Sequence, residues 1–162
     1  MSEKMIGNHG KTLGRLIDEK LGCMEKIHEL TLQMKTELDE RDGENVNQLI
    51  DLRQKEMDRV DALDAEFLSV FSAVKKLLGV RDLGEISPTQ APELAGLKEK
   101  VARVNDRANR TLVIEKENEI KLKEKMASVQ KEMNVVRKGK QGVRAYESAP
   151  KSNDGYFYDK KK

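Results

Sequence analysis

The sequence predicts an all-α protein: an elongated antiparallel three-helix bundle or coiled coil with a long, overhanging C-terminal helix and a flexible tail. Apolar residues recur at intervals of three and four over three long stretches, which is the spacing of one buried helix face. Charged residues make up 37% of the 162 residues and aromatic residues only 4%, with no tryptophan. This composition suits long helices packed along a narrow seam better than a large globular core.

The first predicted helix spans about residues 11–41, and residues 1–10 are expected to be disordered. Eight residues of this helix share one face: Leu13, Ile17, Leu21, Met24, Ile27, Thr31, Met34 and Leu38. Asp42 and Gly43 predict a turn after the helix, because glycine readily takes the left-handed conformation that ends a helix. Asn45 is a suitable N-cap for the helix that follows.

The second predicted helix spans about residues 46–78. Its apolar face has one charged member, Arg53, and consists of Val46, Leu49, Arg53, Met57, Val60, Leu63, Phe67, Val70, Val74 and Leu77. Phe67 and Phe71 are the only aromatic residues before the tail, so we expect them at the thickest part of the core. Gly79 is expected to end this helix.

Residues 79–91 form a predicted linker that is rich in glycine and proline. Asp82 and Glu85 fit one capped turn, which would fold Leu83 and Ile86 over the end of the bundle. Pro92 fits the first turn of the next helix, where a missing backbone N–H has no cost.

The third predicted helix, residues 92–138, is the longest. Its first seam contains Leu94, Leu97, Val101, Val104, Ala108 and Leu112, and after a charged interruption a second begins: Leu122, Met126, Val129, Met133 and Val136. At 1.5 Å per residue this helix measures about 70 Å, against about 45 and 50 Å for the other two. We therefore expect about 20 Å of it to extend beyond the turn at residues 41–45.

The second seam of this helix is the candidate binding site, because no other predicted helix reaches far enough to cover it. Uncovered apolar stripes are usually interaction surfaces, and the flexible, polarisable methionine side chain adapts to different partners. Three other interpretations remain open: the end of the helix frays, it kinks back, or it pairs with a second copy as a homodimeric coiled coil.

Residues 139–162 are predicted to be a flexible basic tail. From Arg137 to the C-terminus there are eight basic and three acidic residues, a net charge of +5, while residues 1–136 carry −3. Four aromatic residues in this tail are candidates for a short docking motif: Tyr146, Tyr156, Phe157 and Tyr158. The alternative is that they pack back on the bundle.

Catalytic, metal-binding and cofactor-binding residues are not predicted, so we expect a protein that is not an enzyme. His9 lies near the N-terminus and His28 beside the first seam, and neither has the companions that a metal site needs. Cys23 is the single cysteine, which excludes an internal disulfide and is typical of a reducing compartment. A net charge of +2 without a recognisable module argues against nucleic-acid binding.

Membrane insertion is also not predicted. The first ten residues lack the apolar run of a signal peptide, and no stretch approaches the ~20 apolar residues that a membrane-spanning helix needs. We therefore expect a soluble cytoplasmic protein.

Three stretches resemble the FlgN family of flagellar type III export chaperones. In the second helix the pattern is Leu49-x-x-Leu52-Arg-Gln54-x-x-Met57, and in the third it is Asn105-x-x-x-Asn109-x-x-Leu112-Val113. The C-terminus, with Tyr146 followed by Gly155-Tyr-Phe-Tyr-Asp-Lys-Lys-Lys162, is similar to the ending of some members.

The resemblance implies a cytosolic helical chaperone without ATPase activity. Such proteins bind the C-terminal amphipathic helix of hook–filament junction subunits of the FlgK and FlgL type and deliver them to the export gate. Laying a client helix along residues 122–136 would bury the second seam, and the tail aromatics would contact the client or the export machinery. Residues 115–125 are more charged than the family's binding helix, which favours Met126 to Val136 as the centre of the site.

Overall fold

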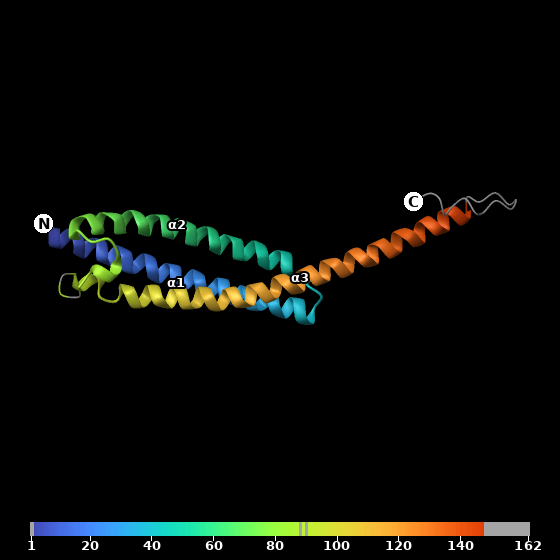
Figure 1. Cartoon of the computed structure of the whole chain (residues 1–162), viewed down its shortest axis with the longest axis horizontal. Coiled ribbons are helices and arrows are strands. Elements are labelled where there is room, and N and C mark those ends of the chain that lie inside the picture. Colours follow the sequence, from blue (N-terminus) through green and yellow to red (C-terminus); the bar gives the residue numbers. More distant parts are fainter. Residues whose placement is uncertain (1, 88, 90, 148–162) are drawn as a thin grey trace. The chain divides into compact units, whose positions relative to one another are not determined.

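The computed structural model describes residues 2–87, 89 and 91–147. It contains three α-helices, α1 (Ser2–Glu40), α2 (Val46–Leu78) and α3 (Leu97–Glu147), and two short 3-10 turns, η1 (Leu83–Glu85) and η2 (Pro92–Leu94) (Figure 1). The described residues are 90% helical and include no strand. The predicted all-α class is confirmed.

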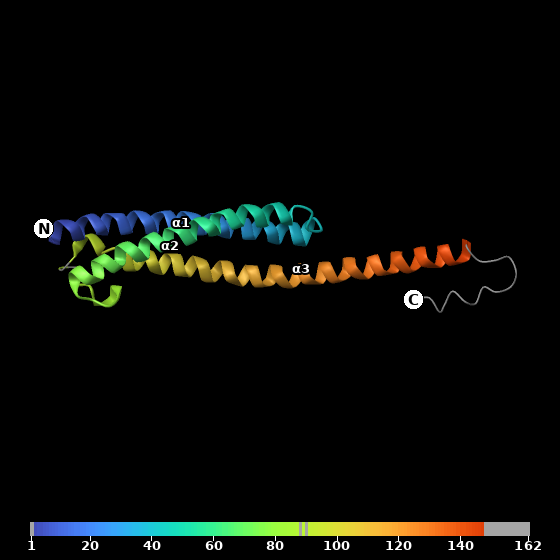
Figure 2. The same cartoon turned by 90° about the horizontal axis from the view of Figure 1, so that it is seen from above.

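The chain divides into two units, residues 1–119 and residues 120–162, and α3 runs through the boundary. In the first unit α1 and α2 lie side by side and antiparallel, joined by the turn at residues 41–45 (Figures 1 and 2). The early part of α3 runs parallel to α1, because Lys100 pairs with Asp18 and Arg107 with Glu25. It therefore runs antiparallel to α2, whose residues Leu63 and Phe67 lie near Val101 and Val104.

The N-terminal residues differ from the prediction, since α1 begins at Ser2 instead of Lys11. Ile6 and Gly10, which belong to the segment expected to be disordered, are buried. The linker explains the difference: η2 packs against this part of α1, and a Cβ on Gly10 would lie only 2.7 Å from Cβ of Glu93. Contacts with a segment more than 80 residues away in sequence, which helix periodicity does not reveal, thus order the first turns of α1.

The turns at both ends of α2 follow from left-handed residues. Asp42 and Gly43 have φ values of 60° and 78°, and the N–H of Gly43 donates to the carbonyl of Glu37 at 3.0 Å. Gly79, with φ of 66°, ends α2 as predicted. Asn45 precedes α2 but does not cap it through its side chain; Nδ2 instead donates to Oε1 of Glu37 at 3.3 Å.

The linker closes one end of the bundle. Asp82 caps η1, since Oδ1 accepts a hydrogen bond from the N–H of Glu85 at 3.2 Å. Ile86 is buried beneath this turn, as the sequence predicted. Pro92 begins η2 and not the long helix, which starts five residues later at Leu97.

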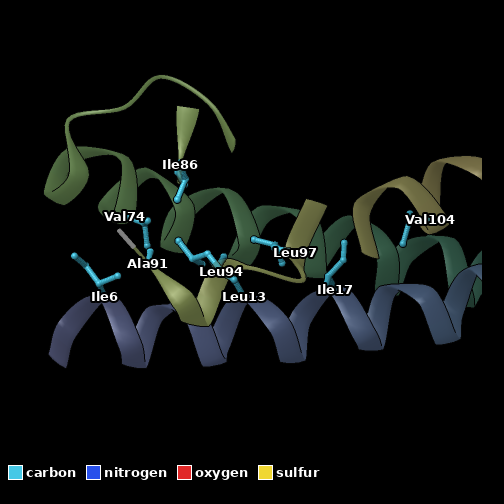
Figure 3. Close-up of a cluster of buried hydrophobic side chains, with 9 residues drawn as sticks. All are labelled: Ile6, Leu13, Ile17, Val74, Ile86, Ala91, Leu94, Leu97 and Val104. Atoms are coloured by element: carbon cyan, nitrogen blue, oxygen red, sulfur yellow. The ribbon is translucent and has the colours of Figure 1, made fainter. Parts of the chain in front are cut away.

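The main apolar core lies at this end of the first unit. Figure 3 shows that its members come from α1, α2, the linker and the start of α3: Ile6, Leu13, Ile17, Val74, Ile86, Ala91, Leu94, Leu97 and Val104. Phe67 and Phe71 pack against the core as partly buried residues, with ring centroids 5.9 Å apart. A smaller cluster of Leu16, Cys23 and Leu63 continues between α1 and α2.

The C-terminal end of α3 lies beyond its predicted end at residue 138. The helix continues through Gly139 and Gly142 to Glu147, so the predicted tail at residues 139–162 starts too early. A glycine costs a helix about 1 kcal/mol relative to alanine, which weakens these turns without breaking a helix that already propagates into them. Among the described residues, none of the helices has the length and apolarity to cross a bilayer.

Candidate functional site

The five residues expected to bind a partner lie in one row on α3, within the unit that begins at Ile120. We call Leu122, Met126, Val129, Met133 and Val136 the apolar row. The last four are 63%, 53%, 55% and 55% exposed, and Leu122 is partly buried. Large side chains of this kind are normally removed from water, so four of them exposed in one line form an unusual surface.

The apolar row does not continue the seam of the first unit in the same register. That seam advances by alternating steps of four and three through buried or half-buried positions: Leu97, Val101, Val104, Ala108, Thr111, Glu115 and Asn118. From Asn118 the apolar row begins with two successive steps of four, to Leu122 and Met126. Such a stutter locally unwinds heptad packing. It coincides with the boundary between the units, at Glu119 and Ile120.

The seam of the first unit becomes polar after Ala108, where the sequence had suggested Leu112. Leu112 is 47% exposed, and Thr111 is buried in its place. Oγ1 of Thr111 donates to the carbonyl of Arg107 at 2.9 Å and lies 2.7 Å from Nδ1 of His28.

Two further polar contacts hold α3 on the other helices. Nδ2 of the buried Asn118 donates to the carbonyl of Thr31 on α1 at 3.0 Å. Glu115 pairs with Nη1 of Arg53 on α2 at 2.8 Å. Hydrogen bonds and an ion pair therefore attach this part of α3, whereas the early part of the helix also contributes Leu97 and Val104 to the apolar core.

A second apolar surface, which the sequence did not reveal, opens beside the polar seam. It is an open groove of about 310 Å³ with walls from all three helices of the first unit. Met24 and Ile27 contribute from α1, Met57 and Val60 from α2, and Leu112 from α3. The periodicity had assigned all five to buried faces. Leu112 and Met57 are instead substantially exposed at the edge of the groove.

The decisive comparison is with protein families. Residues 5–153 match the family described as FlgN protein. The chain belongs to the FlgN family. This match covers most of the chain and confirms the resemblance seen in the sequence. Neither a curated protein nor a solved structure matches the chain.

Membership of the FlgN family indicates a role as a flagellar export chaperone, a function carried out by protein binding. A protein-binding function requires a surface that a polypeptide segment can cover. The apolar row and the groove are two such surfaces.

The predicted tail motif of this FlgN chain is only partly described. Tyr146 lies in the last turn of α3 and is 84% exposed. Tyr156, Phe157 and Tyr158 lie outside the described residues, and a tail docking motif stays a prediction.

His28 and Cys23 of this FlgN chain are packed within the helical bundle. His28 is half-buried and bound to Thr111, while His9 lies in the first turns of α1. Burial raises the pKa of the Cys23 thiol above its ordinary value of 9.0, and the nearby carboxylate of Glu56 raises it further. The thiol is therefore protonated and unreactive at neutral pH. Within the described part of the chain, no group of His, Cys, Asp and Glu has the arrangement of a metal site.

Proposed function

We propose that this FlgN-family protein is a cytosolic export chaperone for hook–filament junction proteins of the FlgK and FlgL type. In this proposal the chaperone binds the C-terminal amphipathic helix of its client along the apolar row and delivers the client to the flagellar export apparatus. Family membership supports the chaperone role, and the exposed apolar row supports the location of the site.

The observation that carries the proposal is the exposure of Met126, Val129, Met133 and Val136 in one line. Fully burying a valine or methionine side chain contributes roughly 1.5–3 kcal/mol, so covering four partly exposed ones provides several kcal/mol for binding. A client helix with apolar side chains at intervals of three and four would cover all four together, as amphipathic helices do in helical recognition sites.

The first test is a double substitution in the apolar row, Met126→Asp with Met133→Asp. Each aspartate places a charge where the client would bury an apolar side chain, so we expect binding of a purified junction protein to fall at least ~100-fold. Binding is measured by isothermal titration calorimetry, and helix content by circular dichroism. Because both residues are exposed, helix content and thermal stability should not change.

The matched control is Val135→Asp. Val135 lies on the same helix and is 66% exposed, but it is outside the apolar row. We expect this variant to bind the client as the unmodified protein does. Undiminished binding by the double variant would refute the site. A loss of helix content in that variant would show that the row is structural core.

The second test concerns the function itself. Full-length protein and a chain ending at Lys125 are used as baits in native cytosol, and retained proteins are identified by mass spectrometry. Retention of FlgK- and FlgL-type subunits by the full-length bait alone is the expected result. Retention by both baits would keep the function and reject the site. Capture of only a second copy would favour a self-associating coiled-coil scaffold and overturn the chaperone proposal.

A further inference from the structure

The charges beside the apolar row are predominantly basic. In a heptad with Met126 and Met133 at the a positions and Leu122, Val129 and Val136 at the d positions, the residues directly before each a and directly after each d flank the contact with a partner helix. Over residues 122–137 these flanking positions are Lys123, Lys125, Gln130, Glu132 and Arg137. Three are cationic and one is anionic: one edge carries Lys123, Gln130 and Arg137, and the other carries Lys125 and Glu132, so the flanking charge is positive in sum.

The same sign extends over the described helix of the second unit. Residues 120–147 contain eight basic and three acidic residues, a net charge of +5. Residues 1–119 contain 19 basic and 24 acidic residues, a net charge of −5. The boundary between the two units is therefore also a boundary between an acidic bundle and a basic helix.

We propose that the partner recognised by the apolar row is an amphipathic helix whose apolar residues are bordered mainly by aspartate and glutamate. This inference rests on the proposed function, because it names the chemical class of client for the same site. Opposite charges at flanking positions determine which helices pair, in addition to the apolar contacts. The client helix is expected to be acidic at the positions that face Lys125 and Arg137.

A second copy of the chain is a poor occupant of the same surface. Pairing two copies of residues 120–147 brings a net charge of +5 against +5. Like charges across an interface suppress association, whereas an acidic client helix neutralises the same surface. In addition, Lys140 occupies the position that follows Val136 in the apolar row, so its charge ends the apolar contact.

An anionic membrane surface would also attract a basic amphipathic helix. The composition of the row favours a peptide helix instead. Helices that lie in a membrane interface typically bury Trp, Phe or Leu. The apolar row has no aromatic residue and one leucine, and its other members are two valines and two methionines. Methionine suits a protein surface that must fit the side chains of another helix.

The test uses two designed four-heptad peptides with identical apolar positions, one with glutamate and the other with lysine at every flanking position. Binding of each to the full-length protein is followed by fluorescence anisotropy at low and high salt. We expect the acidic peptide to bind at least ~10-fold more tightly than the basic one, with the difference shrinking at high salt because salt screens exposed charges.

The decisive variant is Lys125→Glu with Arg137→Glu, which should reverse the preference between the peptides. Its control is Lys131→Glu with Lys138→Glu: the net charge changes equally, but both residues are exposed on the face of α3 opposite the row. The control should retain the preference for the acidic peptide. Equal binding of the two peptides, or an unchanged preference in the Lys125 and Arg137 variant, would overturn the inference.

Failure of the inference and failure of the proposed function give different results. If a junction protein binds through Met126 and Met133 but is insensitive to the charge reversal, the function stands and the charge inference is wrong. If the acidic peptide binds through the row but junction proteins do not, the surface is correct and the function is wrong. Tighter binding to phosphatidylglycerol vesicles than to the acidic peptide would overturn the inference in favour of a membrane partner.

Discussion

At the scale of single residues, the seam between α3 and α1 changes from apolar to polar over two turns. Val104 is packed in the apolar core, while Thr111 and Asn118 occupy the next positions of the same heptad series. Asn118 uses one side of its amide, through Nδ2, but its Oδ1 is buried without a hydrogen-bond partner. Such a half-satisfied group reduces stability, since the unpaired oxygen has lost its water.

Replacing this amide should therefore stabilise the bundle. We expect Asn118→Leu to increase the free energy of unfolding by about 1 kcal/mol and to raise Tm by about 2–4 °C. In this variant the carbonyl of Thr31 loses the hydrogen bond from Nδ2 but remains part of the helical backbone of α1. Thermal unfolding followed by circular dichroism measures the change. Asn118→Asp, which buries a charge at the same place, should lower Tm, and a lower Tm for Asn118→Leu would contradict the interpretation.

At the scale of the elements, the first turns of α1 are ordered by η2 and not by their own sequence. Gly10 and Gly14 are one helical turn apart on α1, but their surroundings differ. A Cβ on Gly10 would lie 2.7 Å from Cβ of Glu93, whereas a Cβ on Gly14 would have no neighbour within 4 Å. The close approach of the linker therefore requires glycine at position 10 only.

The two glycines provide a matched pair of substitutions. Gly14→Ala should raise the free energy of unfolding by about 0.5–1 kcal/mol, because alanine favours the helix and fits the space. Gly10→Ala should lower it, because η2 must move away from α1. Urea unfolding of the two variants gives the comparison. Equal stabilisation by both would mean that η2 does not pack against α1 as described.

At the scale of the whole molecule, the two units differ in how many apolar side chains they bury. Among the described residues, every buried apolar side chain belongs to residues 1–119. The second unit contributes helix 120–147 with exposed apolar residues and a net positive charge. Stability and the proposed binding are therefore assigned to different parts of the chain.

A chain that ends at Glu119 should separate these two properties. We expect this fragment to unfold cooperatively, with Tm within about 5 °C of the full-length value, because the apolar core is complete within it. It should not bind the junction protein. Calorimetry measures the first property and titration with the client the second. A fragment without a cooperative transition would show that the second unit contributes to folding.

The sequence by itself determined the features that depend on neighbours along the chain. Helix class, the end of α2 at Gly79, the turn capped by Asp82 and the positions of the apolar row all follow from local spacing and backbone preference. The composition also indicated a narrow seam. Local preference is informative here because a helix is defined by contacts three and four residues apart.

The tertiary structure decided which residues are buried. The sequence predicts disorder at Ile6, which is buried because the linker packs on α1. It also places Leu112 in the seam, where Thr111 and Asn118 are the buried residues. Neighbouring helical residues differ by about 100° in direction, so only the position of the partner helices selects one of two adjacent faces. Burial depends on segments distant in sequence, and that is the physical reason why periodicity located the helices but not all of their contacts.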